Sequence, residues 1–177
     1  MCADKPLERV NYVYGQILTV DDFTTEQSYF LERLRRHNRH LHGWGVVSGL
    51  TVSVQDATVF VEPGLAIDCA GNEIHLCSGV RCALPGDGRR LYVTVEYIET
   101  PVGLVPIPGE PAGADADPLA YTRIREGCQV DLARKDPQSR HAGMGPGTPG
   151  CGSQHPISIA RLLKAAKGWK VVPLGRR

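Results

Sequence analysis

The stretch over residues 19–42 constrains this chain most, because it predicts one long amphipathic helix in a sequence otherwise rich in short strand patterns. Thr19 is a favourable N-cap residue, and Asp22 three positions later completes an approximate capping box. Acidic residues gather in the first turns and basic residues in the second half, which complements the helix dipole. At about 1.5 Å of rise per residue, this helix would be roughly 35 Å long.

Apolar residues follow one face of the predicted helix. The stripe is largely apolar and recurs at steps of three and four residues: Phe23, Gln27, Phe30, Leu34, Asn38 and Leu41. Such a stripe is typical of a helix that contacts a core, so we expect Phe30 and Leu34 to be buried against strands. Leu34→Ala should then cost ~2–5 kcal/mol of stability as a core truncation.

Two glycines predict where the helix ends. Gly43 and Gly45 can adopt the left-handed backbone conformation that a helix terminus needs. Trp44 lies between them, and we expect its large ring to cover the corner between the helix and the next element. Apolar and polar residues alternate from Leu50 onward, so a strand should follow the corner.

Most of the remaining chain predicts short β-strands separated by turns. The clearest strand covers residues 91–97, which alternate strictly and are rich in β-branched side chains. Residues 70–72 predict a tight turn within a hairpin. The fold class is therefore α+β or mainly β, with one long N-terminal helix packed on a small β-sandwich or an open barrel with long loops. The expected strands are residues 50–54, 57–62, 65–68, 73–77, 80–84, 91–97, 121–126, 129–132, 157–162 and 169–173.

The chain divides into three regions. Residues 1–18 predict an N-terminal extended segment, residues 19–98 the helix and a β core, and residues 99–177 a loop-rich β continuation. Within the last region, residues 99–118 are rich in proline and glycine and predict a long loop. Glycine, proline and polar residues dominate residues 134–156, where we expect a mobile excursion.

Composition excludes several classes of protein. The net charge of +1 argues against general nucleic-acid binding. The apolar runs are far shorter than the 18 or so residues of a membrane span, and the N-terminal residues have no hydrophobic segment typical of a secretion signal. The six cysteines include no Cys-x-x-Cys pair, so we expect reduced thiols in a protein synthesised in the cytoplasm.

Cysteine and histidine residues in the second half form a candidate metal site. Cys128 and Cys151 flank the predicted excursion, and His155 follows four residues after Cys151. Thiolate and imidazole are the ligands of structural zinc, so Cys128, Cys151 and His155 would be its ligands here. The alternative is that no cofactor is bound, and that the reduced cysteines pack as small hydrophobic residues.

The sequence contains no pattern that predicts an enzyme. It has no nucleophile elbow, no phosphate-binding glycine loop and no dinucleotide fingerprint. His37 and His40 have a spacing that metal sites use. The alternative is that His37, Asn38 and His42 hydrogen-bond the last carbonyls of the helix or the neighbouring strands. We therefore expect a non-catalytic protein.

Several separated blocks of the first eighty residues match a known family in one order. The blocks are residues 14–23 (YGQILTVDDF), 26–29 (EQSY), 37–39 (HNR), 41–50 (LHGWGVVSGL), 59–68 (with PGLAID) and 71–74 (GNEI). The chain resembles a family of small proteins and domains that occur with phage-tail-like contractile injection systems and related baseplate components. Val13 stands where the family usually has an aromatic residue, and the second half resembles the family only loosely.

The resemblance implies a structural or adaptor role in a tail-like particle. Its partners would be other proteins of that particle, and we expect a homo-oligomer that uses loops of its second half for contact. Two other functions stay open at this point. One is a metal-stabilised binding module for a carbohydrate or peptide, built on residues 99–118 and 134–156, and the other is a small hydrolase.

Overall fold

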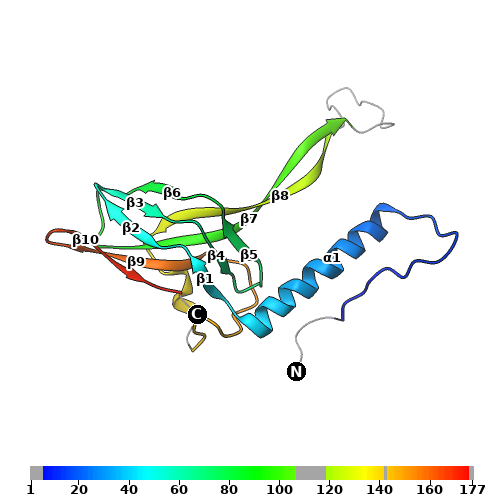
Figure 1. Cartoon of the computed structure of the whole chain (residues 1–177), viewed down its shortest axis with the longest axis horizontal. Helices are drawn as coiled ribbons and strands as arrows, with labels where there is room; N and C mark the ends of the chain where they lie inside the picture. Colours follow the sequence, from blue (N-terminus) through cyan, green and yellow to red (C-terminus); the bar gives the residue numbers. More distant parts are fainter. Residues whose placement is uncertain (1–5, 107–118, 142, 176–177) are drawn as a thin grey trace.

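The computed structural model describes residues 6–106, 119–141 and 143–175. Over these residues an α-helix precedes ten antiparallel strands (Figure 1). The helix α1 (Val20–His37) continues into a π-helical turn, η1 (Asn38–His42). A 3-10 turn, η2 (Pro137–Arg140), lies between strands β8 and β9. The strands are β1 (Gly45–Gly49), β2 (Val52–Gln55), β3 (Thr58–Val61), β4 (Gly64–Ile67), β5 (Glu73–Leu76), β6 (Val80–Ala83), β7 (Arg90–Pro106), β8 (Leu119–Ala133), β9 (Ile157–Ala165) and β10 (Gly168–Pro173).

The strands form three sheets, with the orders β1-β4-β5, β2-β3-β6 and β10-β9-β7-β8. Their inner faces share one hydrophobic core, and the predicted α+β, mainly β class is confirmed. The predicted hairpin around residues 70–72 is present, because β4 and β5 pair antiparallel from Gly64↔Leu76 to Ile67↔Glu73. The apolar side chains with less than 2% exposure are Val59, Val61, Ala66, Cys69, Ile74, Leu91, Val93, Val95, Ile157, Ala160 and Leu162.

The start and end of the helix are where local sequence signals place them. The Thr19 hydroxyl accepts from the backbone N–H of Asp22, and the Asp22 carboxylate accepts from the Thr19 N–H at 2.8 Å, which completes the capping box. The backbone N–H and the hydroxyl of Thr19 both donate to the Asp22 carboxylate, and these two hydrogen bonds lower the pKa of the Asp22 carboxyl. Gly43 and Gly45 have φ angles of 69° and 131°, and Trp44 is only 4% exposed. The predicted corner is therefore confirmed.

The predicted burial of the apolar stripe is wrong. Helix α1 has no buried residue, and Phe30 and Leu34 are 58% and 48% exposed. Figure 1 shows the reason, because α1 leads away from the strands and meets them only at its C-terminal end. The β core ends before most of the stripe begins, so the stripe faces solvent in the single chain.

The predicted loop over residues 99–118 also needs correction, because β7 runs on to Pro106 and pairs with β8 in a long two-stranded arm (Figure 1). β8 is one continuous strand, although the sequence predicts two strands that meet at Gly127. Pro101 fits within the arm because β9 pairs with β7 only as far as Val95, which leaves one edge of the outer arm without a partner in the described chain. Residues 107–118 lie outside the described residues.

Candidate functional site

Polar side chains attach the C-terminal end of α1 to the turn between β4 and β5. Asn38 is 3% exposed, and its side-chain amide donates to the Gly71 carbonyl at 3.0 Å. The Arg39 guanidinium donates to the Ala70 carbonyl at 2.8 Å. These residues belong to two of the sequence blocks described above, residues 37–39 and the stretch around residue 71. The blocks meet in space and set the direction in which the helix leaves the core.

Asp68 organises the same turn from within. Its carboxylate accepts from the backbone N–H groups of Ala70 and Asn72 at 2.8 and 2.9 Å and from the Asn72 side-chain amide at 2.8 Å. Burial raises the pKa of the Asp68 carboxyl, although these hydrogen bonds act in the opposite direction. The Arg35 guanidinium in turn donates to the Asn72 side-chain oxygen at 2.6 Å, so the helix and the turn form one hydrogen-bonded unit.

The segment over residues 134–156, for which the sequence predicts a mobile excursion, contacts the corner at Trp44. The N–H of Gly147 donates to the Trp44 carbonyl at 2.8 Å, and the Trp44 N–H donates to the Thr148 carbonyl at 3.2 Å. At the start of the segment, the Asp136 carboxylate accepts from the Ser158 hydroxyl at 2.8 Å. The many glycines and turn residues of this segment allow its backbone to follow the corner closely and to exchange hydrogen bonds with it.

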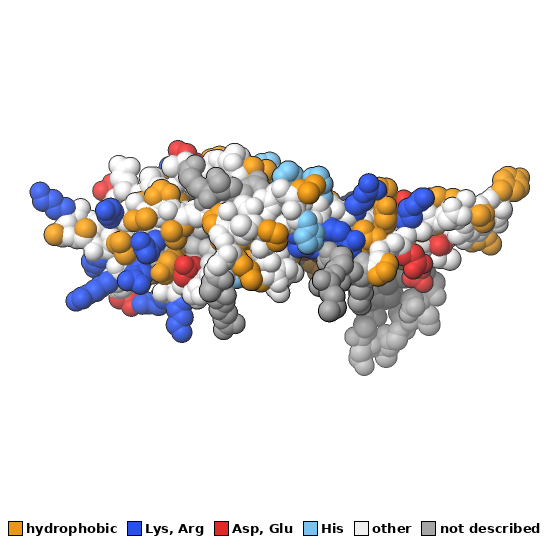
Figure 2. All heavy atoms as spheres, turned by 90° about the horizontal axis from the view of Figure 1, so that it is seen from below, with side chains coloured by type: hydrophobic (Ala, Val, Ile, Leu, Met, Phe, Trp, Pro, Cys, Tyr) orange, Lys and Arg blue, Asp and Glu red, His pale blue; other side chains and the backbone are white. Residues whose placement is uncertain are grey.

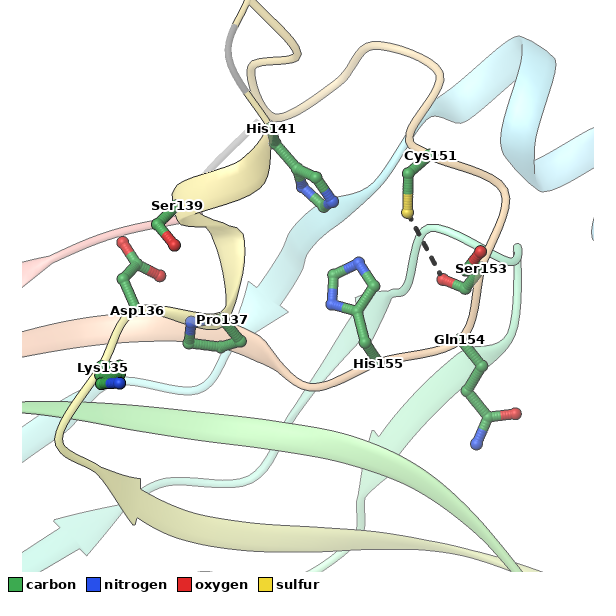
Figure 3. A pocket seen from close by; sticks show the side chains of 9 residues that line it. All are labelled: Lys135, Asp136, Pro137, Ser139, His141, Cys151, Ser153, Gln154 and His155. Atoms are coloured by element: carbon green, nitrogen blue, oxygen red, sulfur yellow. Dashed lines mark hydrogen bonds between the residues drawn. The ribbon is translucent and has the colours of Figure 1, made fainter.

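Two cysteines and two histidines meet where this segment covers the turn. The ligand atoms of Cys69, His141, Cys151 and His155 all lie within 4.8 Å of one another. Cys69 follows β4 and is fully buried, His141 follows η2, and the other two residues precede β9. Figure 3 shows the side chains of His141, Cys151 and His155 converging from two stretches of the chain. We call these four residues the Cys–His cluster.

The structure brings together two of the three ligands predicted from the sequence. Cys151 and His155 are both in the Cys–His cluster, but Cys128 is not. Cys128 lies on β8 opposite Tyr97 and packs against the hydrophobic core, and burial raises the pKa of its thiol to about 11. Cys69 and His141 are absent from the predicted set, since they are 72 residues apart and no spacing pattern connects them.

The hydrogen bond of the His155 ring to Pro156 defines which of its two nitrogens is available to bind a ligand. Nδ1 lies 2.8 Å from the Pro156 carbonyl oxygen and must donate its hydrogen there. Nε2 therefore carries the lone pair in the neutral ring, and it is buried with no hydrogen-bond partner in the described chain. The ring of His141 lies between those of His155 and Trp44, with centroid distances of 4.7 and 5.6 Å.

The electrostatics of the cluster favour uncharged groups. Burial and the neighbouring Cys151 thiol raise the pKa of the Cys69 thiol to about 12. Burial and the neighbouring His155 ring lower the pKa of His141. Burial is the largest cause of both shifts, and the nearby Asp136 carboxylate offsets part of the shift at His141. A cleft of about 490 Å³ opens beside the cluster (Figure 3), lined by Lys135, Asp136, Pro137, Ser139, His141, Cys151, Ser153, Gln154 and His155.

The second notable surface is apolar and lies on the regions of the molecule that extend from the β core. Figure 2 shows hydrophobic side chains along this extended end, at the right of the view, with Lys and Arg side chains among them. None of the described helices is both long and apolar enough to cross a membrane. The exposed apolar side chains before and on the helix and along the β7–β8 arm are Tyr12, Val13, Tyr14, Ile17, Leu18, Val20, Phe23, Phe30, Leu31, Leu34, Leu41, Leu104, Val105, Leu119, Tyr121 and Ile124.

Comparison with known proteins relates the fold to one class of assembly. No protein-family model and no curated protein matches this chain. A chain in the cryo-electron microscopy structure of the type VI secretion system TssK–TssF–TssG baseplate subcomplex has a similar fold, with a TM-score of 0.53 and 12% identity over 94% of this chain and 60% of that chain. A TssK crystal structure gives a TM-score of 0.48, also at 12% identity, over 94% of this chain and 41% of that one. The chain thus spans less than two thirds of either protein, and its fold occurs in a chain of a type VI secretion baseplate subcomplex.

Proposed function

We propose that this chain is a non-catalytic structural or adaptor component of a phage-tail-like assembly, and that it docks onto other chains of the particle through α1 and the β7–β8 arm. The observation that carries the proposal is an amphipathic helix without a single buried residue. The fold similarity to a chain of a baseplate subcomplex and the family-like sequence blocks support the choice of assembly.

The exposed stripe on α1 has the spacing of a packing surface. Phe23, Phe30 and Leu34 follow one another on α1 at steps of seven and four residues, which places them on one face of the helix, and Leu41 on η1 follows seven residues later. Complete burial of one such side chain contributes ~1.5–3 kcal/mol. An exposed, largely apolar stripe of this kind is common where a helix docks into a groove of a partner.

The β7–β8 arm offers a second contact surface. Its outer half carries Leu104, Val105, Leu119, Tyr121 and Ile124, all of them exposed. The arm projects beyond the core in the same general direction as α1 (Figure 1), so a large partner could contact both. The contact surface in the second half of the chain would then be a strand pair and not a flexible loop.

A homo-oligomer also belongs to this proposal, because tail-like assemblies are symmetric and repeat their components. The same stripe that meets another particle protein can be covered in the free protein by a second copy. Measurement of the mass in solution tests for this oligomer, and a concentration-independent monomer would remove it from the proposal.

The docking role is tested by incorporation into particles. The double variant Phe30→Ser/Leu34→Ser removes two exposed apolar side chains that do not belong to the core, so the free chain should remain folded. Loss of two buried contacts at the interface should lower incorporation into purified tail-like particles by tenfold or more. The amount of the chain per particle is measured by quantitative mass spectrometry.

Ser28→Ala is the matched control, because Ser28 is also exposed on α1 but lies on the other side of the helix. This variant should be incorporated as the wild-type chain is. Normal incorporation of a folded Phe30→Ser/Leu34→Ser chain would exclude the stripe as the docking surface. Absence of the wild-type chain from particles made by the cells that express it would contradict the proposed function itself.

A further inference from the structure

We propose that Cys69, His141, Cys151 and His155 form a structural zinc site that attaches the 134–156 segment to the corner between α1 and β1. The proposal concerns the stability of the fold and does not depend on the proposed docking function. It rests on the convergence of four donor groups, on their distances and on the hydrogen bonds that orient them.

The donor set suits zinc. Two thiolates and two imidazoles are a common ligand combination for structural zinc, and four protein ligands leave no open position for catalysis. Asp136 is the one carboxylate among the residues that line the cleft; its Oδ1 accepts from the Gln138 backbone N–H at 3.0 Å and from the Ser158 hydroxyl, and it does not belong to the Cys–His cluster. The four residues of the cluster therefore form the complete ligand set.

The distances are close to those of a tetrahedral centre. With bonds of ~2.3 Å to sulfur and ~2.0 Å to nitrogen, zinc holds its ligand atoms about 3.3–3.8 Å apart. The four ligand atoms here lie within 4.8 Å of one another, and Cys69 Sγ is 3.9 Å from His141 Nδ1. On binding one central ion, the ligand atoms that are farthest apart would have to approach one another by about 1 Å.

Neighbouring backbone groups orient the ligands of the cluster. The Nδ1–H of His155 is held by the Pro156 carbonyl, which is the usual second hydrogen bond of a zinc-bound histidine and leaves the buried Nε2 free to bind. A Cβ at Gly150 would lie 2.5 Å from the Cys69 sulfur, so glycine is needed for Cys151 to approach Cys69 this closely. A divalent cation would also offset the cost of a thiolate at the buried Cys69, and the protons of both thiols would pass to solvent.

A zinc ion here would connect stretches of the chain that are distant in sequence. Cys69 belongs to the turn that holds the end of α1, and His141 contacts the Trp44 ring at the corner. The other two ligands lie just before β9. The small side chains and many glycines of the 134–156 segment provide little apolar area for packing, so a metal would supply the stability that hydrophobic burial does not.

Elemental analysis of the full chain tests the proposal. The wild-type protein should contain one zinc ion per chain, and Cys151→Ser should lower the zinc content at least tenfold after dialysis. Cys77→Ser is the matched control, because Cys77 is also an exposed thiol but lies outside the cluster, and it should keep the full zinc content. Equal zinc loss in both variants, or a wild-type chain without zinc, would overturn the site.

Cobalt titration of the metal-free wild-type chain provides a second measurement that requires no variant to fold. Co²⁺ in a tetrahedral site with two thiolates gives intense visible bands and a sulfur-to-metal charge-transfer band, which zinc should then displace. A weak octahedral spectrum would contradict the site. Titration of free thiols checks the competing chemistry, since a disulfide between Cys69 and Cys151 in the isolated protein would exclude the zinc site.

Discussion

Gly71 illustrates how one residue allows the helix to approach the β core. Its φ angle is 91°, and an added Cβ would clash with the Arg35 carbonyl oxygen. The Gly71 carbonyl also accepts from the Asn38 side-chain amide. Gly71 therefore touches the end of the helix twice, with its Cα against the Arg35 backbone and with its carbonyl at Asn38. The contact explains why a glycine stands in one of the sequence blocks and why an asparagine stands in another.

Gly71→Ala should destabilise the chain by more than the cost of a positive φ angle alone, which is ~1–3 kcal/mol. The added methyl group must push the turn away from α1, which stretches the hydrogen bonds of Asn38 and Asn72. Chemical denaturation measures the change in the free energy of unfolding. Gly168→Ala is the matched control, because Gly168 has a φ of 108° but no atom within 4 Å of an added Cβ. Equal losses in the two variants would mean that the close approach at Gly71 contributes nothing.

The ends of helices and strands can be predicted from local sequence, but the burial of an element depends on long-range contacts. Thr19, Asp22 and Gly43 set the ends of the helix through hydrogen bonds and backbone conformation within a few residues, so the sequence predicts these ends well. The strand alternation of β7 is equally local. Whether an apolar stripe is buried depends on how far the β core extends, and no pattern in the helix itself contains that information.

The same distinction explains the β7–β8 arm and the Cys–His cluster. Proline and glycine in residues 99–106 favour a loop, but cross-strand pairing with β8 outweighs this local preference. Cys151 and His155 are four residues apart and could be recognised as a pair. Cys69 joins them only because the β4–β5 turn lies under the 134–156 segment, and that arrangement is a property of the tertiary fold.

The exposure of α1 leads to a prediction about stability. Leu34→Ala should change the free energy of unfolding of the isolated chain by less than about 1 kcal/mol, because surface substitutions usually have small effects. The same substitution at Leu91, which is 1% exposed in the core, should cost ~2–5 kcal/mol. Both values come from denaturant unfolding of the monomeric protein. A loss at residue 34 as large as that at residue 91 would show that the stripe is covered within one chain.

The whole molecule combines a compact β-rich body with two extensions that expose apolar side chains. The β core, the corner at Trp44 and the Cys–His cluster form a compact body in which the 134–156 segment is held by backbone hydrogen bonds. Helix α1 and the β7–β8 arm extend from this body and expose apolar side chains to solvent (Figures 1 and 2). A compact body with two apolar extensions is suited to connecting neighbours in an assembly, which is the role we propose.

Cryo-electron microscopy of tail-like particles purified from cells that produce this chain is the most direct test of this function. We predict density for the β core in the particle, with the Phe30 and Leu34 face of α1 covered by a neighbouring chain. Particles without this chain, or a particle-bound chain whose helix stripe still faces solvent, would contradict the proposed function.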